Sequence, residues 1–112
     1  GYERRVYDDE VVLTWRSSLQ NRDISRCYPN PFKDIATIEY YLTESCETSI
    51  IIYNLQGQKI RLFKNENAIS GFHTLNWNGT DERGKKAPPG VYFYRIKTEA
   101  GIIETKRMIL LN

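Results

Sequence analysis

The sequence predicts an all-β protein, either a sandwich or a barrel. Its β-branched and aromatic residues come in short runs, and turn residues separate these runs at intervals of about 10 residues. No segment shows the apolar stripe of an amphipathic helix. The 112 residues suit one domain with a short appendage, and a chain of this length buries about two-thirds of its extended surface in a single core.

The first 26 residues differ in composition from the rest. They hold five arginines and no lysine, whereas the remainder holds seven lysines and four arginines. We interpret residues 1–26 as a linker or the tail of a preceding domain, and residues 27–112 as the main domain. Residues 11–15, VVLTW, are an alternative added strand. We interpret the chain as part of a longer protein, so the lack of a signal peptide in it does not indicate where the parent protein is located.

Two prolines stiffen the segment before the first alternating run. Pro29 and Pro31 fix φ near about −65° and favour extended backbone at Tyr28 and Asn30. Neither proline can donate a ladder hydrogen bond, which suits the edge of a sheet or the start of one. Tyr28 and Phe32 are expected to cap one end of the core.

A clear strand follows over residues 36–42, ATIEYYL. Its residues alternate between two faces, with Ile38, Tyr40 and Leu42 on one of them. The next run, TSIIIY at 48–53, is apolar on both faces.

A tight hairpin is predicted at NLQGQ, because Gly57 can adopt a positive φ at low cost. It leads into the strand KIRLF, residues 59–63, and then into a polar loop, KNENAISG, residues 64–71. The strand at 72–77, FHTLNW, places His73, Leu75 and Trp77 on one face.

The segment 78–90, NGTDERGKKAPPG, is rich in turn residues. Gly79 and Gly84 can supply left-handed positions, and Asp81 can accept backbone hydrogen bonds as Asx turns do. Two strands follow, at 91–97 and 102–111. The second ends in apolar residues on both faces, which indicates a strand that is covered on both sides or that another protein will cover.

Catalytic and metal sites find little support in the sequence. His73 is the single histidine and is expected to pack, since no nucleophile motif accompanies it. One histidine and two cysteines fall short of the roughly four ligands of zinc. Asn78, Asp81 and Glu82 crowd one loop, where an Asx turn is favoured over calcium. We predict no enzyme activity, cofactor or small-molecule substrate.

The two cysteines, Cys27 and Cys46, either form one disulfide in an oxidising compartment or remain free thiols. The overall charge is nearly balanced, with 16 basic and 14 acidic residues, which argues against a nucleic-acid partner or a membrane-surface binder. No run of about 18 apolar residues occurs, so no transmembrane helix is predicted.

Six motifs in order carry a family resemblance: YPNPF, ATIEYYL, IIIYNLQGQKIR, GFHTLNWNGTDERGK, PPGVYFYRI and a final TKRMILL. Over about residues 27–112 the chain resembles the C-terminal sorting domain, type A, of type IX secretion cargo from Bacteroidetes. The resemblance implies an immunoglobulin-like β-sandwich of about seven antiparallel strands. It also implies a family motif whose role is structural, formed by Tyr28, Pro29, Asn30, Pro31, Phe32, Trp77, Gly79, Asp81, Gly84, Gly90, Tyr92 and Tyr94.

The resemblance further implies a secretion signal that is not an enzyme. The parent protein would enter the periplasm and pass through the type IX outer-membrane translocon. A sortase would then cut near residues 16–26 and attach the N-terminal passenger to the cell surface, or the domain would be retained. The predicted recognised feature is the terminal strand, which a partner reads by strand addition: Lys106, Arg107, Met108, Ile109, Leu110 and Leu111.

Two alternatives stay open at this point. The terminal residues can be only the last core strand. The domain can also be a retained immunoglobulin-like structural or adhesive module of a surface protein or a secretion-machinery component. In that case Trp15, Trp77, Tyr92 and Tyr94 are candidates for a carbohydrate-stacking platform, and an exposed aromatic patch on a flat sheet face would favour the module.

Overall fold

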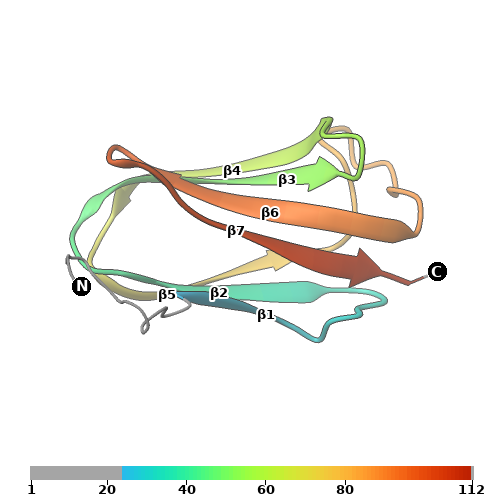
Figure 1. Cartoon of the computed structure of the whole chain (residues 1–112), viewed down its shortest axis with the longest axis horizontal. Coiled ribbons are helices and arrows are strands. Elements are labelled where there is room, and N and C mark those ends of the chain that lie inside the picture. Colours follow the sequence, from blue (N-terminus) through green and yellow to red (C-terminus); the bar gives the residue numbers. More distant parts are fainter. Residues whose placement is uncertain (1–23, 112) are drawn as a thin grey trace, which may run out of the picture.

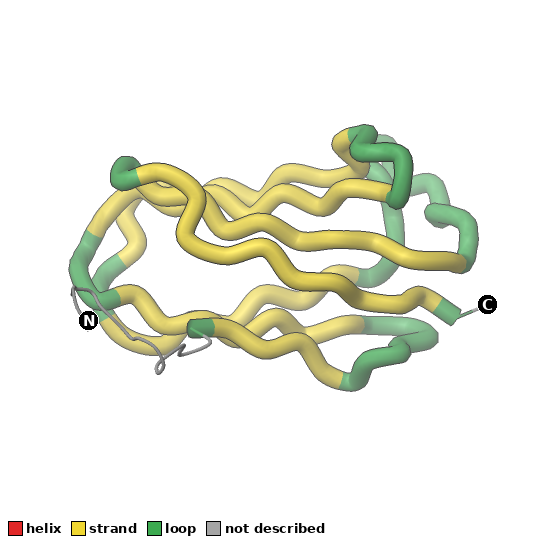
Figure 2. Tube along the Cα trace, viewed as in Figure 1, coloured by secondary structure: helices red, strands yellow, loops and turns green. Residues whose placement is uncertain are grey.

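The computed structural model describes residues 24–111 as two antiparallel β-sheets packed face to face (Figure 1). One sheet has the strand order β1-β2-β5 and the other the order β4-β3-β6-β7. The loops gather at the two ends of the sandwich (Figure 2). The strands are β1 (Ser25–Tyr28), β2 (Ala36–Leu42), β3 (Cys46–Asn54), β4 (Lys59–Ala68), β5 (Gly71–Trp77), β6 (Gly90–Thr98) and β7 (Gly101–Leu110).

The topology confirms the predicted all-β sandwich with seven antiparallel strands. The fourth strand pairs with the third, whereas in the constant-type immunoglobulin arrangement it joins the sheet of the first, second and fifth strands. The edge strands β1 and β7 lie along one open side of the sandwich, and β4 and β5 lie along the other.

The core lies between the two sheets and follows the alternation of the sequence. Ile38, Tyr40 and Leu42 share one face of β2, as predicted, and this face points inward, with at most 5% of each residue exposed. The same alternation in β6 buries Tyr92, Tyr94 and Ile96. The largest fully buried side chains are Trp77, Tyr94, Phe32, Ile38, Ile52, Ile96, Met108 and Thr48.

The hairpin predicted at Gly57 is confirmed. Gly57 has a φ of 85°, and its N–H donates to the Asn54 carbonyl oxygen at 3.0 Å. The Asn54 side-chain oxygen accepts from the backbone N–H groups of Gln56 and Gln58. The turn therefore joins β3 to β4 with local backbone and side-chain bonds.

The polar loop predicted at residues 64–71 is wrong. β4 continues to Ala68 and keeps its pairing with β3, with Asn65 opposite Thr48 and Ala68 opposite Cys46. Only Ile69 and Ser70 separate β4 from β5. The register shifts once in this stretch, and most of its side chains are exposed, so an edge strand forms here without an apolar pattern.

The first strand of the sandwich is β1, which the sequence did not predict as a strand. It pairs with β2 along its whole length, from Ser25 opposite Tyr40 to Tyr28 opposite Thr37. The alternative strand at 11–15 lies outside the described residues, and the domain boundary at residues 26 and 27 stays a prediction.

Candidate functional site

The predicted recognition residues divide between the two faces of β7. Met108 and Leu110 point into the core and are 0% and 4% exposed. Arg107 and Leu111 are exposed, and Ile109 is half-buried. The terminal strand therefore anchors itself with one set of side chains and presents the other.

The outer backbone edge of β7 is hydrogen-bonded to the segment 29–32, which we call the proline segment. The amide of Asn30 bridges two residues of β7, because its Oδ1 accepts from the Ile109 N–H at 2.9 Å and its Nδ2 donates to the Arg107 carbonyl at 3.2 Å. The Phe32 N–H donates to the Ile109 carbonyl at 2.9 Å, and the Phe32 carbonyl accepts from the Leu111 N–H at 2.7 Å. A partner that adds a strand along residues 107–111 therefore has to displace the proline segment.

The bonds of the proline segment explain what the sequence CYPNPF does. Its Tyr28–Pro29 and Asn30–Pro31 peptide bonds are both cis, and Phe32 forms a parallel bridge with Leu110. The prolines stand at a sheet edge, as predicted, and the edge they follow is that of β7.

Several residues of the family motif meet around the end of β7. Phe32 is fully buried, with its ring 5.5 Å from that of Trp77, and the Trp77 ring lies 5.4 Å from that of Tyr92. The Cδ atoms of Leu110 lie 3.5 and 3.6 Å from the position that a Cβ on Gly79 would take. The inward side chain of the terminal strand is thus enclosed by the motif.

Other motif residues shape the neighbouring turn. Asp81 Oδ1 accepts from the backbone N–H groups of Arg83 and Lys85 at 2.9 and 3.0 Å, and Gly84 has a φ of 83°. This confirms the Asx turn. Among residues 24–111, no group of three or more histidine, cysteine or acidic side chains is placed to hold a metal ion.

The expectation that Tyr28 caps the core is wrong, whereas that for Phe32 is confirmed. In β1 the residues Ser25 and Cys27 point toward the other sheet, so alternation turns Tyr28 outward. Tyr28 is 41% exposed, and the guanidinium of Arg26 lies 5.0 Å from its ring centroid.

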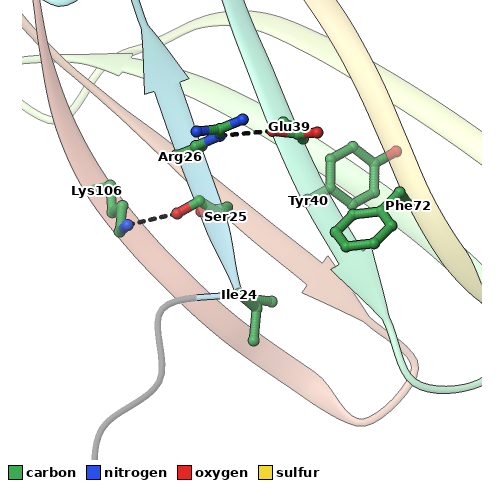
Figure 3. A pocket seen from close by; sticks show the side chains of 7 residues that line it. All are labelled: Ile24, Ser25, Arg26, Glu39, Tyr40, Phe72 and Lys106. Carbon is green, nitrogen blue, oxygen red and sulfur yellow. Dashed lines mark hydrogen bonds and ion pairs between the residues drawn. The ribbon is translucent and has the colours of Figure 1, made fainter.

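A second set of contacts joins β1 to β7, and we call it the β1–β7 contact. Glu104 accepts from the Ile24 N–H at 2.9 Å and from the Ser25 hydroxyl at 2.8 Å. The Lys106 ammonium donates to the Ser25 carbonyl at 2.5 Å (Figure 3) and lies 3.3 Å from Glu104. The Ser25 hydroxyl also lies 2.8 Å from the Tyr94 hydroxyl. Lys106 thus holds the first strand of the domain as well as being a predicted recognition residue.

The cysteines are both free thiols, so the structure takes the second of the two alternatives. The Cys27 sulfur lies 3.9 Å from the Met108 sulfur, and Cys46 lies beside the Thr48 hydroxyl. Burial raises the pKa of the Cys27 thiol, and the nearby charge of Lys106 opposes this rise. A half-buried thiol with a raised pKa is a poor nucleophile.

His73 packs, as predicted. Its ring stacks on Tyr40 at 5.3 Å between centroids, and Nε2 lies 2.6 Å from the Ile69 carbonyl oxygen. Trp77, Tyr92 and Tyr94 are at most 3% exposed, so they form no stacking platform, and Trp15 lies outside the described residues. No helix within residues 24–111 is long and apolar enough to cross a membrane.

Exposed aromatic side chains occur instead on the outer face of the first sheet. Phe72 is 75% exposed and Tyr41 is 41% exposed. They face each other across β2 and β5, with their rings 4.9 Å apart and inclined at 63°.

Comparison with known proteins relates the whole sandwich to secretion domains. The family model described as "Secretion system C-terminal sorting domain" matches residues 26–111. A search of curated proteins found no match. The match begins within β1 and ends one residue after β7, so it spans all seven strands.

Solved structures share the fold at low sequence identity. Dimeric latent PorU from Porphyromonas gingivalis superposes with a TM-score of 0.66 at 20% identity, over 78% of this chain and 9% of that protein. PorZ, an essential surface component of the type IX secretion system of the same organism, gives 0.57 at 19% identity, over 79% and 11%. FlgD from P. aeruginosa gives 0.57 at 19% identity, over 68% and 60%. The chain thus spans about a tenth of PorU and PorZ, and these likenesses establish the fold alone.

Proposed function

Because the chain belongs to the family of type IX secretion C-terminal sorting domains, we propose that it directs an N-terminal passenger through the type IX outer-membrane translocon. The observation that carries the proposal is the family match over the complete sandwich. In this proposal the domain acts by being recognised, and the passenger supplies any further activity.

The proposed recognised feature is the outward side of the terminal strand. Arg107, Ile109 and Leu111 are presented at the surface, while Met108 and Leu110 fix the strand in the core. Lys106 contributes indirectly, because it holds the Ser25 backbone. A translocon component reads the folded strand by these side chains, or by strand addition after the proline segment has moved aside.

We place the proposed sortase cut before residue 24. The backbone of Ile24 and Ser25 is held by Glu104 and Lys106, and the next residues pair with β2. A protease binds its substrate as an extended segment, so residues 24–28 would have to leave the sheet first. Of the cleavage region 16–26, this favours residues 16–23. The passenger is then attached to the cell surface and the sandwich is released.

A fusion experiment tests the proposal. The full 112-residue chain is placed after a periplasm-directed fluorescent reporter and expressed in a type IX-secreting bacterium and in its translocon-deficient mutant. We expect reporter on the surface or in the medium only in the competent strain, with a new C-terminus between residues 16 and 23 by mass spectrometry. Reporter in the periplasm of both strains would refute the proposal.

Two variants of the fusion examine the terminal strand. Deletion of residues 105–112 is expected to abolish secretion, but it also removes core residues. Ile109→Ser with Leu111→Ser changes only outward side chains. It is expected to lower secretion strongly while thermal unfolding shifts only slightly, by the amount that the half-buried Ile109 contributes. Normal secretion of this double variant would show that these side chains are not read.

A retained adhesive module is the second candidate function. The exposed pair Tyr41 and Phe72 on the outer face of the first sheet favours it, because exposed aromatic rings can stack on sugars. A glycan array with the full chain and its Phe72→Ala variant tests this function. Glycan binding that the variant loses would support it, and absence of binding by the unchanged chain would remove it.

A further inference from the structure

The outer face of the four-stranded sheet carries aromatic and basic side chains in one continuous row. The row crosses all four strands in register, from Lys59 of β4 through Tyr53 of β3 and Phe93 of β6 to Arg107 of β7. Their neighbours in the chain, such as Tyr92 and Met108, point into the core. The four side chains therefore project to the side that faces away from the other sheet.

A second row lies beside the first and supports it. It consists of Leu62, Ile51, Arg95 and Thr105, again in register across the four strands. Ile51 lies outside the core cluster yet is only 6% exposed, so its neighbours on this outer face cover it. The Arg95 guanidinium lies 5.2 Å from the Tyr53 ring centroid, and its Nε donates to the Thr105 hydroxyl at 3.3 Å.

The two rows hold three positive charges and no negative charge. Lys59 and Arg107 form no ion pair with any residue of 24–111. The acidic residue of β3, Glu47, is already paired with Lys64 at 3.2 Å, and it lines a pocket with Glu66 and Glu99. At the edge of the second row the Glu82 carboxylate accepts from the Leu62 N–H at 2.6 Å, and it is paired with Arg61 at 3.7 Å. Lys59 and Arg107 therefore stay without an ion pair among the described residues, although the chain as a whole carries only +2.

We infer that these two rows, the basic–aromatic face, are a docking surface for an acidic protein surface. Tyrosine, phenylalanine and arginine are the side chains that protein interfaces concentrate, and Arg95 is already fixed in place, which lowers the entropy lost on binding. Two copies of this face would repel each other, so a second copy of the chain is the wrong partner. The inference rests on the proposed function, because Arg107 belongs to the terminal strand.

Charge reversal in the reporter fusion tests the face. The triple variant Lys59→Glu, Arg95→Glu and Arg107→Glu is compared with Lys33→Glu, Lys85→Glu and Lys86→Glu, an equal charge change at exposed loop positions. We expect the first triple to lower the secreted fraction about tenfold, since like charges across an interface are strongly unfavourable. The control triple is expected to behave as the unchanged chain.

Two further measurements separate a docking defect from a folding defect. The periplasmic reporter carrying the Glu triple must resist protease as the unchanged domain does. The single variant Arg107→Glu, at an exposed side chain of β7, must show the same direction of effect. Equal secretion by the unchanged chain and a stably folded Glu triple overturns the inference.

Photo-crosslinking identifies the chemistry of the partner. A photoreactive phenylalanine analogue replaces Phe93 in secreting cells, and the same analogue at Phe72 on the opposite sheet is the control. We expect a cross-link from position 93 to a peptide with clustered aspartate or glutamate, and reversal of those acids to lysine restores secretion of Arg107→Glu. A cross-link only to polysaccharide or lipid, or to a second copy of the chain, overturns the inference.

The design distinguishes the inference from its premise. If the unchanged fusion stays in the periplasm of the competent strain, the proposed sorting function has failed. If the unchanged fusion is secreted and position 93 gives no cross-link, the sorting function stands and the docking surface is wrong.

Discussion

Asn30 acts on the terminal strand as the backbone of a neighbouring strand would. Its amide supplies one donor and one acceptor to residues 107 and 109 of β7, so it continues the hydrogen bonding of the sheet with a side chain. Asparagine suits the position because its amide carries both groups at the same end.

The first prediction concerns this amide. Asn30→Ala is expected to lower the free energy of unfolding by about 1–2 kcal/mol, because two exposed hydrogen bonds to β7 are lost. Urea denaturation measures the change, and hydrogen exchange at the Ile109 amide should become faster. Asn30→Asp keeps the acceptor for the Ile109 N–H and loses the donor. Its free energy of unfolding should therefore lie between that of the unchanged chain and that of Asn30→Ala. An unchanged Ile109 exchange rate in Asn30→Ala would contradict the assignment.

The second prediction compares two glycines with the same backbone strain. Gly79 and Gly84 have φ values of 77° and 83°, so alanine at either is expected to lower the free energy of unfolding by about 1–2 kcal/mol. At Gly84 no atom lies within 4 Å of the new Cβ, and at Gly79 the Leu110 methyl groups lie at an ordinary contact distance. We therefore expect the two thermal shifts to be alike. A much larger loss at Gly79 would show that Leu110 cannot adjust.

At the scale of elements, the β1–β7 contact connects the start of the domain to its last strand. Glu104 is the centre of this contact, because it accepts from Ile24 and Ser25 and pairs with Lys106. Its side chain is only 12% exposed, so its bonds are partly shielded from water.

The third prediction removes this acceptor. Glu104→Ala is expected to lower the free energy of unfolding by about 1–3 kcal/mol and to speed tryptic cleavage after Arg26, because β1 loses its hold on β7. Mass spectrometry of timed digests measures the cleavage rate. Glu99→Ala is the control, because Glu99 is exposed and lies in the turn between β6 and β7. It should leave the free energy of unfolding and the cleavage rate unchanged. Equal cleavage rates in the two variants would disprove the role of Glu104.

The strands that the sequence predicted well are those with one buried face. The run 36–42 has the predicted bounds, because alternation is visible wherever inward residues must be apolar. The second half of β4 and the whole of β1 lie at sheet edges. Their pairing is fixed by backbone hydrogen bonds and by side chains as distant in the sequence as Glu104. Neither of these interactions produces an alternating pattern of apolar residues in the strand itself.

At the scale of the whole molecule, two buried tyrosines and the half-buried Cys27 make stability depend on pH on the alkaline side. Burial raises the pKa of the Cys27 thiol above its ordinary value of 9.0, against the opposing charge of Lys106. Burial likewise raises the pKa of the Tyr40 and Tyr92 phenols above 10.0. In each case the unfolded chain loses its proton first, so stability is fully present below the ordinary pKa and falls as the pH rises through the folded pKa.

The fourth prediction follows from this sign. The urea midpoint at about pH 10.5 is expected to lie below that at about pH 8. Between these pH values the Cys27 thiol and the Tyr40 and Tyr92 phenols lose their protons more readily in the unfolded chain than in the folded one. Cys27→Ala and Tyr40→Phe each remove one titrating group, so each should reduce the difference between the two midpoints. A midpoint that rises with pH would contradict the burial of these groups.

The candidate site was predictable in its outline only. The terminal residues and the motif around Trp77 follow from the order of the motifs. Alternation predicts the two faces of β7, but both carry apolar residues, so the sequence did not predict that the face of Met108 and Leu110 is the buried one. The bonds from Asn30 and Glu104 were not predictable, because they join residues about eighty positions apart. The sequence around each residue does not indicate which distant residue it will contact. The basic–aromatic face also needs the register of four strands before its charges are seen to be neighbours.

The side-chain bonds between the ends of the domain also set an order on its biosynthesis. They span between 77 and 81 residues, so none of them can form until translation has passed residue 104. A nascent chain that stops short of β7 leaves β6 with an unpaired edge and leaves the space beside Gly79 and Phe32 unfilled. Under the proposed function, a translocon that recognises the outward side of this last strand would export only passengers that have been translated as far as β7. Prematurely terminated proteins would stay behind for periplasmic proteases.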